Sequence, residues 1–405
     1  MLCQTLFSED EEMMKKMAVV LALMLCICMG AAAESMNMDA RVDDVFRGTK
    51  TVGGAFIVAK KGEIVYERYY GEQQKTTHVP VTEDTYFRCA SVTKLVTGIG
   101  LMKMMDEGLL DPDEDISTYL GYTVRNRRYM DKPITLRILM SHTAGLVENY
   151  GFAHKSSLLR DLIDLDRKSA GNFKKAVEPG SQYTYSNFGA GLTGAIVESV
   201  TGKDVSTYMR ESLFAPLGID AAYSATQLEK PENIAATYHK DGSLYAAPSY
   251  LLRQEYIAEA MPDVHYRTTI GSLLIRPRDL AKLGIAICGD GTVDGKRVLS
   301  EEMIHAMRQE HSREMDGITA ESPYTFFTIR QDTLFDGLRV YGHQGTDEGI
   351  VCNLYVEPQN EIVIVVMTNG CKTNRDDGIM RITRRLAAIA EEAYIKGNVE
   401  SVPAD

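Results

Sequence analysis

Hydrophobic positions along the chain follow two spacings, one typical of helices and one typical of strands. Residues 38–46, MDARVDDVF, carry apolar side chains at helical spacing. The same spacing recurs in residues 91–108, which begin at Ser91 and end at Gly108. Between them, residues 53–71 form two β-rich runs on either side of Lys60-Lys61-Gly62, which predicts a hairpin.

The second half of the chain changes from helical to strand spacing. From about Thr135 to Leu252 the pattern is mostly helical, and residues 276–287, RPRDLAKLGIAI, predict a further helix. The tail predicts strands at residues 324–331, 338–343, 349–358 and 361–369, the last two joined by a short turn containing Asn360. A helix from about Arg375 to Tyr394 closes the chain. Strands at both ends around a helical middle predict an α+β fold, with one antiparallel sheet built from both chain ends, flanked by helices, and a mostly helical insertion.

The pattern contains no internal repeat and no low-complexity linker between Glu34 and the C-terminus. We therefore expect residues 34–405 to form a single domain with two interwoven lobes. The sheet lobe is predicted at about 36–90 and 265–400, and the helical lobe at about 91–264. With 405 residues and 44% hydrophobic side chains, the chain can bury a large core.

The first 33 residues have the pattern of an export signal. Lys15 and Lys16 precede an apolar run, and Ala31 and Ala33 supply the small residues of a cleavage site. This predicts a signal peptide over residues 1–33, a mature start near Glu34, and a periplasmic or extracellular location. The residues before position 13 are acidic, which fits a signal poorly, so Met13 or Met14 is an alternative start. An uncleaved anchor is the other alternative, although the apolar run is short for a bilayer.

Charge and cysteine content narrow the possible functions. The formal charge is -12, which disfavours binding to the phosphate backbone of nucleic acids. Four cysteines lie beyond the predicted signal, and they allow three pairings among which the sequence does not choose: Cys89, Cys288, Cys352 and Cys371. A fold of this size does not require disulfides, so buried free thiols are the favoured interpretation.

The predicted helix at residues 91–108 begins with a Ser and a Lys spaced by three residues. Ser91 and Lys94 form the only S-x-x-K pair in the chain, and this spacing brings both side chains to one side of a helix. A serine at a helix N-terminus also lies where partial positive charge favours an oxyanion. The alternative is an ordinary Ser cap followed by a surface lysine.

A second candidate element is Tyr185-Ser186-Asn187, the only Y-x-N in the chain. A tyrosine near a cation can transfer protons, and an asparagine amide can hydrogen-bond a substrate carbonyl or a lysine. The alternative is a turn followed by a helix cap.

A third candidate element, His343-Gln344-Gly345, ends a predicted strand. A glycine there allows close approach of a substrate backbone, and a cation beside it favours an anionic group. The same loose pattern also fits residues 60–62 and 240–242, which we interpret as turns.

Together, and in this order, the three elements resemble the motifs of the serine β-lactamase and penicillin-binding family. The nearest branch contains class C β-lactamases, D-alanyl-D-alanine carboxypeptidases, D-aminopeptidases and related esterases. Other stretches are similar to that branch, so the resemblance covers roughly Thr51 to Leu386: residues 134–146, 178–202, 213–219, 276–287 and 342–370. The resemblance implies a β-lactamase/transpeptidase-like fold.

The resemblance also implies a serine-hydrolase mechanism with an acyl-enzyme at Ser91. Lys94 and Tyr185 would share the role of general base, with Tyr185 as proton donor to the leaving group. The backbone N–H groups of Ser91 and Thr346 would form the oxyanion hole. Substrate-binding roles fall to three other residues, of which the first would also orient Lys94: Asn187, His343 and Gly345.

Two departures from class C β-lactamases bear on the substrate. His343 stands where those enzymes usually have Lys, and Thr93 stands where they usually have a second Ser. Both features favour an esterase or a D-peptidase acting on peptidoglycan-type peptides. A true class C-like β-lactamase, and an inactive homologue that binds cell-wall or acyl ligands, are the alternatives.

Other hydrolase patterns are missing from the sequence. It contains neither G-x-S-x-G nor H-E-x-x-H, and no cluster of His and Cys at zinc-binding spacing. We therefore expect no metal and no cofactor, and a small-molecule or peptide substrate as the partner. His142, in the stretch SHTAGL, is interpreted as a structural residue.

Overall fold

The computed structural model describes residue 17 and residues 38–148, 158–167, 172–253, 259–309 and 324–399. Apart from residue 17, the segment predicted as a signal peptide lies outside these residues, so that assignment stays a prediction. Within the described residues, no helix is both long enough and apolar enough to cross a bilayer.

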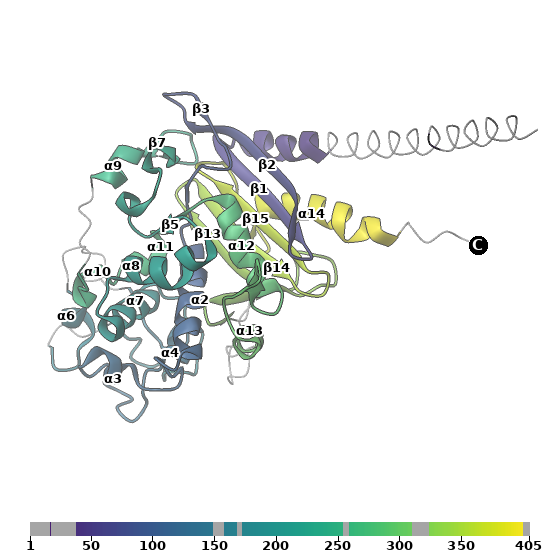
Figure 1. Ribbon diagram of the computed structural model, residues 1–405. Helices are drawn as coiled ribbons and strands as arrows, with labels where there is room; N and C mark the ends of the chain where they lie inside the picture. The colour runs from purple at the N-terminus through teal and green to yellow at the C-terminus, as the bar shows by residue number, and fades with distance from the viewer. Residues whose placement is uncertain are drawn as a thin grey trace, which may run out of the picture.

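The centre of the fold is an eight-stranded antiparallel sheet built from both ends of the chain (Figure 1). Strand β15, near the C-terminus, pairs with β1, near the N-terminus, in the register Gly54 to Thr368 through Lys60 to Ile362. This confirms the fold class predicted from the sequence. In spatial order the strands are β11 (Tyr324–Thr325), β12 (Thr328–Gln331), β13 (Val340–Asp347), β14 (Ile350–Glu357), β15 (Ile362–Thr368), β1 (Gly53–Lys60), β2 (Glu63–Gln74) and β3 (Val79–Pro80).

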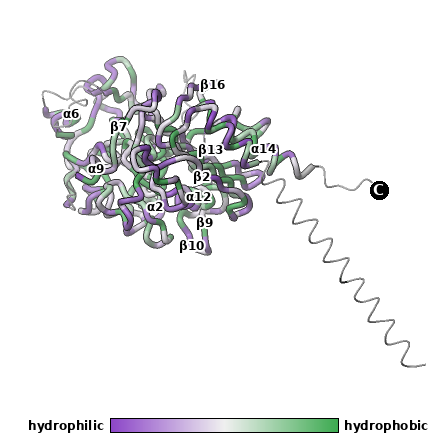
Figure 2. Tube along the Cα trace, turned by 90° about the horizontal axis from the view of Figure 1, so that it is seen from above, coloured by the Kyte–Doolittle hydropathy of each residue, from purple (hydrophilic) through white to green (hydrophobic). Residues whose placement is uncertain are grey.

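The sheet is covered on both faces, which explains the continuous apolar runs of its central strands. Every residue of β14 and β15 is buried. In β1 the alternating side chains divide between two cores: Ile57 packs in one with α2 and α12, and Phe56 packs in the other with α14. Figure 2 shows hydrophobic segments gathered in the interior and hydrophilic ones along the outer turns.

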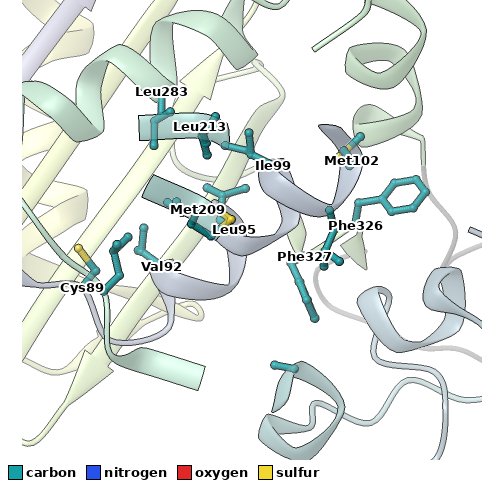
Figure 3. Packing of buried hydrophobic residues seen from close by; sticks show 14 of the residues in the cluster. Cys89, Val92, Leu95, Ile99, Met102, Met209, Leu213, Leu283, Phe326 and Phe327 are labelled. Carbon is teal, nitrogen blue, oxygen red and sulfur yellow. The ribbon is translucent and has the colours of Figure 1, made fainter. Parts of the chain in front are cut away.

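Helices flank both faces of the sheet, and another helix joins it to the rest of the molecule. Helix α12 (Pro277–Cys288) packs on β1, β14 and β15, whereas α14 (Arg381–Tyr394) packs on the other face. Helix α2 (Val92–Asp106) lies between the sheet and the helical part (Figure 1). Its buried side chains Val92, Leu95, Ile99 and Met102 share helical spacing and line one core cluster (Figure 3).

The segment between α2 and α12 is less regular than its sequence pattern predicts. Among the described residues of this segment, the longest helix is α7 (Asn187–Thr201), and the other α-helices are only four or five residues long. These are α3 (Ile116–Leu120), α4 (Leu136–Met140), α6 (Leu159–Ile163), α8 (Val205–Met209), α9 (Pro248–Leu252), α10 (Pro262–His265) and α11 (Thr268–Gly271). Short strands also occur: β5 (Ala221–Ala222), β6 (Thr237–Tyr238), β7 (Leu244–Ala246) and β8 (Leu274–Ile275), which pairs with β4 (Phe87–Arg88) and β5. Beyond α12 come the hairpin β9 (Thr292–Val293) and β10 (Lys296–Arg297) and helix α13 (Glu301–Arg308).

Two elements near the C-terminus differ from their predicted extents. Residues 324–331 form a hairpin of β11 and β12 instead of one strand, because Phe326 and Phe327 adopt φ values of 45° and 60°. The last helix begins at Arg381, since β16 (Arg375–Asp376) and β17 (Ile379–Met380) occupy its predicted start. Asp377 and Gly378, both with positive φ, form the tight turn between them, which is a hairpin signal typical of Asp-Gly.

Candidate active site

Ser91 lies at the turn between β4 and α2, where its hydroxyl group is free to face the site. It is the N-cap of α2 but has helical backbone angles, and its side chain makes no capping hydrogen bond. The preceding Ala90 is buried with φ of 45°, a left-handed conformation that costs energy for a residue with a Cβ. The chain is therefore bent sharply just before Ser91, and the interpretation of Ser91 as an ordinary cap does not fit its geometry.

Lys94 lies one helical turn after Ser91 and is fully buried. Its Nζ donates hydrogen bonds to Ser91 Oγ at 3.2 Å and to the carbonyl of Ile270, in α11, at 2.8 Å. Burial lowers the pKa of Lys94 to about 7, although the Glu148 carboxylate opposes this shift. Lys94 is thus not a surface lysine, and its amine is close to half neutral at pH 7.

Tyr185 approaches Ser91 from the segment that precedes α7. Its hydroxyl donates a hydrogen bond to Ser91 Oγ at 3.1 Å, and Lys94 Nζ lies 5.3 Å from the centre of its ring. Burial raises the pKa of Tyr185 to about 12 and outweighs the opposing effect of its hydrogen bond to Ser91 Oγ. Ser186 caps α7 through a hydrogen bond from the Gly189 N–H at 3.1 Å, so the helix start fixes the position of Tyr185.

The ring of His142 packs against the ring of Tyr185. It is buried, its Nδ1 accepts the Ser186 N–H at 3.3 Å, and its ring centre lies 4.4 Å from that of Tyr185. Burial lowers the pKa of His142 well below its ordinary value, with smaller contributions from Lys94 and His343, so its ring is neutral at pH 7. This placement fits the expected structural role.

Strand β13 brings Gly345 against the turn that carries Ser91. A Cβ atom at Gly345 would lie 2.2 Å from the carbonyl oxygen of Cys89 and 2.8 Å from the Ser91 nitrogen, so only glycine fits there. An ion pair of 2.6 Å between Arg88 and Asp347 fastens the end of β13 to the same turn. Thr346, the other predicted oxyanion-hole residue, lies between Gly345 and Asp347 on this strand.

One edge of β13 beside Ser91 has no neighbour among the described strands. The pairing between β12 and β13 ends at Gly342, and no other described strand pairs with residues 343–347 on that side. An extended chain could hydrogen-bond to this edge, as added strands do in other proteins.

His343 projects from the same face of β13 as Gly345, but only 1% of it is exposed. Its Nδ1 donates to the carbonyl of Gln344 at 2.8 Å, while its Nε2 has no hydrogen-bond partner among the described residues. Burial and the nearby Lys94 lower the pKa of His343 to about 3. The ring is therefore neutral at pH 7, and it lies beneath the surface of the site.

Asn187 is the first residue of α7 and is only partly buried. Its N–H donates to Glu148 at 2.5 Å, and no described hydrogen bond joins its side chain to Lys94. The orienting acceptor of Lys94 is instead the Ile270 carbonyl. Sequence reasoning missed Ile270 and Glu148, because a backbone carbonyl and an isolated carboxylate leave no motif.

A metal has no evident place in this arrangement. Within the described ranges, no three side chains of His, Cys, Asp or Glu converge closely enough to hold an ion.

Comparison with known proteins agrees with the geometry of the site. The family model described as Beta-lactamase matches residues 38–389. Esterase EstB of Burkholderia gladioli is 29% identical over 248 residues, which cover 58% of this chain and 61% of that protein. The D-alanyl-D-alanine-carboxypeptidase/endopeptidase AmpH of Escherichia coli K12 is 28% identical over 237 residues, covering 55% and 61%. The chain thus spans about three fifths of the length of these relatives.

Solved structures show the same fold. D-amino acid amidase from Ochrobactrum anthropi SV3 superposes with a TM-score of 0.67 at 22% identity, covering 91% of this chain and all of that one. A penicillin-binding protein homologue from Pyrococcus abyssi superposes with a TM-score of 0.64 at 22% identity, covering 87% and 76%. The family resemblance seen in the three sequence motifs is confirmed, and the chain belongs to the beta-lactamase family.

Proposed function

We propose that the protein is an exported serine hydrolase that forms an acyl-enzyme at Ser91 and cleaves an ester or amide bond. One observation carries the proposal: Ser91 Oγ lies within hydrogen-bond distance of both the buried Lys94 amine and the Tyr185 hydroxyl. The names of relatives in the family, an esterase and a D-alanyl-D-alanine carboxypeptidase, support this class of reaction.

In the proposed mechanism, Lys94 is the general base and Tyr185 the general acid. A lysine with a pKa of about 7 has a large neutral fraction at pH 7 and can accept the Ser91 proton, whereas a tyrosine with a pKa of about 12 stays protonated. Ser91 Oγ then attacks the substrate carbonyl, and the N–H groups of Ser91 and Thr346 stabilise the oxyanion. Tyr185 protonates the leaving group and recovers a proton from Lys94. Water then releases the acyl group by the same route.

An uncharged ester is the substrate that the buried His343 favours. A Lys at this position would offer a full cation to a substrate carboxylate, whereas neutral His343 contributes no charge. Gly345 and Asn187 would flank the substrate, with its backbone along the free edge of β13.

A second candidate substrate is a D-peptide with a terminal carboxylate. A pocket of about 420 Å³ beside Thr346 is lined by Lys240 and Arg375, and neither has an acidic partner among the described residues. The acidic residues of its lining are already paired, Asp347 with Arg88 and Glu348 with His239. Two unpaired cations next to the proposed oxyanion hole would attract an anionic group of a substrate.

The central experiment is labelling with a fluorophosphonate probe alongside hydrolysis assays. The wild-type protein should be labelled at one serine, and Ser91→Ala should lose both labelling and turnover while it stays folded. We expect p-nitrophenyl acetate or butyrate to be turned over with higher kcat/KM than nitrocefin, with penicillins at most acylating Ser91 slowly. Full activity of Ser91→Ala would refute the assignment, and preference for nitrocefin would replace esterase or peptidase with β-lactamase.

The two substrate classes can be separated by neutralising the pocket. Lys240→Gln and Arg375→Gln should lower kcat/KM for a peptide ending in D-Ala-D-Ala and leave p-nitrophenyl acetate unaffected. Lys372→Gln is the matched control, because Lys372 is exposed nearby but does not line the pocket. Equal losses for both substrates would argue against carboxylate recognition there.

A further inference from the structure

The four described cysteines all have buried thiols, but they lie in three different places. Cys371 packs in the core under α14, with Thr368 Oγ1 at 3.6 Å from its sulfur. Cys288, in α12, lies 3.6 Å from the carbonyl oxygens of Glu357 and Ile362, at the far end of β14. No described contact joins these two thiols to each other or to the turn that carries Ser91.

Cys89 and Cys352, by contrast, lie next to each other in the core cluster behind that turn. In the β13–β14 register Cys352 is opposite Gly345, so its side chain projects from the same face of the sheet. Gly345 has no side chain, and the position that its Cβ would occupy is 2.2 Å from the Cys89 carbonyl oxygen. The Cys352 thiol can thus reach Cys89 beside this gap.

The electrostatics of Cys89 agree with this contact. Burial raises the pKa of the Cys89 thiol well above its ordinary value, and a side-chain hydrogen bond with Cys352 raises it further. Figure 3 shows Cys89 on the segment that leads into α2, next to Val92. Of the three pairings that four cysteines allow, only the one that joins Cys89 to Cys352 links two thiols that lie next to each other.

We propose that Cys89 and Cys352 are a thiol pair that a disulfide oxidant such as glutathione disulfide converts to an intramolecular disulfide, which restrains turnover at Ser91. One thiolate attacks glutathione disulfide, forming a mixed disulfide and releasing one glutathione thiolate. The second cysteine thiolate then attacks the protein sulfur of the mixed disulfide and displaces the other glutathione. Two electrons pass from the protein to glutathione, and the two thiol protons go to the released glutathione molecules.

The proposed effect of the disulfide on turnover follows from the position of Cys89 in the chain. This part of the proposal, unlike the formation of the bond, rests on the proposed function. A covalent bond between two sulfurs is shorter than a contact between two thiols, so Cys89 and Cys352 must approach each other, and a shift of Cys89 toward β14 would displace the turn. Cys89 is two residues before Ser91, across the left-handed Ala90. Because a misplacement of about 1 Å at a reacting group can cost ~100-fold in rate, we expect at least a ~10-fold fall in kcat.

The test compares oxidised and reduced protein. Both thiols are fully buried in the folded protein, where glutathione has little access to them. The full chain is therefore unfolded and then refolded in either reduced glutathione or a glutathione redox buffer. Peptide mapping by mass spectrometry then identifies the linked cysteines, and p-nitrophenyl butyrate reports turnover. We expect a linked Cys89–Cys352 peptide, a loss of turnover, and recovery with dithiothreitol.

Variants separate this pair from the other cysteines. Cys288→Ala and Cys371→Ala should respond to oxidation as the wild type does, whereas Cys352→Ala should keep its turnover in the redox buffer. Mapping that finds all four thiols free, or a different pair, would overturn the pairing. A mapped Cys89–Cys352 bond with unchanged turnover would overturn the restraint. Should the reduced protein hydrolyse no substrate, the proposed function fails, while the mapping still decides whether the bond forms.

Discussion

The pH dependence of acylation tests whether Lys94 is the base. An ordinary lysine, with a pKa of ~10.4, is neutral in only one molecule in ~2,500 at pH 7. With a pKa of about 7, Lys94 is neutral in roughly half of the molecules. Burial thus increases the neutral fraction of the Lys94 amine by about three orders of magnitude at pH 7, and its deprotonation should be nearly complete one to two pH units higher.

We expect the rate of fluorophosphonate labelling to rise with pH along a single titration curve centred near 7. Above pH 8 the rate should be constant, because Tyr185, with a pKa of about 12, keeps its proton there. Stopped-flow or quenched labelling between pH 5 and 9 measures this directly. Labelling measures only the attack of Ser91 on the probe, so its rate is independent of the later steps of turnover.

The sharper perturbation is Glu148→Gln. The Glu148 carboxylate favours the protonated form of Lys94, so its removal should lower the pKa of Lys94 and move the midpoint to lower pH. The Gln side-chain oxygen can still accept the N–H groups of Asn187 and Phe188, which preserves the start of α7. At pH 6 the variant should therefore be labelled faster than the wild type.

The control is Glu178→Gln, which removes a surface carboxylate that is paired with Lys132 instead of acting on the site. Its profile should match that of the wild type. A flat profile from pH 5 to 9 would refute Lys94 as the titrating base. A midpoint that stays in place or moves upward in Glu148→Gln would refute the electrostatic reasoning.

Three further predictions concern packing, metals and processing. Gly345→Ala should lower kcat/KM at least ~10-fold and destabilise the fold by about 1–3 kcal/mol in denaturant titrations, because the new Cβ collides with the Cys89 carbonyl; wild-type behaviour would contradict the contact. EDTA should leave hydrolysis unchanged, and a loss restored by zinc would reveal an overlooked metal site. The exported protein should begin near Glu34 by intact mass, whereas a mature form that keeps residues 17–33 would indicate an anchor.

The sheet could be predicted from sequence because its signals are local. Strands β14 and β15 are buried on both faces, so each is a continuous apolar run, and the β1–β2 hairpin turns at Lys61-Gly62 with positive φ. The turn at Phe326 and Phe327 gave no such signal, since large apolar residues normally continue a strand. It exists because tertiary packing dictates it: both rings are buried and the Phe327 N–H donates to the Met140 carbonyl.

The site, like the sheet, has some features with a local sequence signal and others that depend on residues far away in the chain. Ser91 and Lys94 are one helical turn apart, and Tyr185 immediately precedes a capped helix, so short local motifs made them candidates once the three motifs were taken together. The Ile270 carbonyl that holds Lys94 is 176 residues further along the chain. No sequence pattern specifies a backbone acceptor at that distance, because only the packing of α11 on α2 brings it there.

The burial that perturbs Lys94 also explains why a neutral residue suits position 343. His343 and Lys94 share a space with almost no solvent, and each cation there would disfavour the other. A lysine at position 343, as class C enzymes usually have, would place a second ammonium group beside the first, so one of them would have to lose its proton. With His343 neutral, Lys94 is the cation of the pair, and its charge is balanced from a distance by Glu148. In this protein, therefore, the proton on Lys94 would respond to the proposed reaction at Ser91 without competition from a cation at position 343. Lys240 and Arg375 lie outside that buried space, where solvent weakens their effect on Lys94.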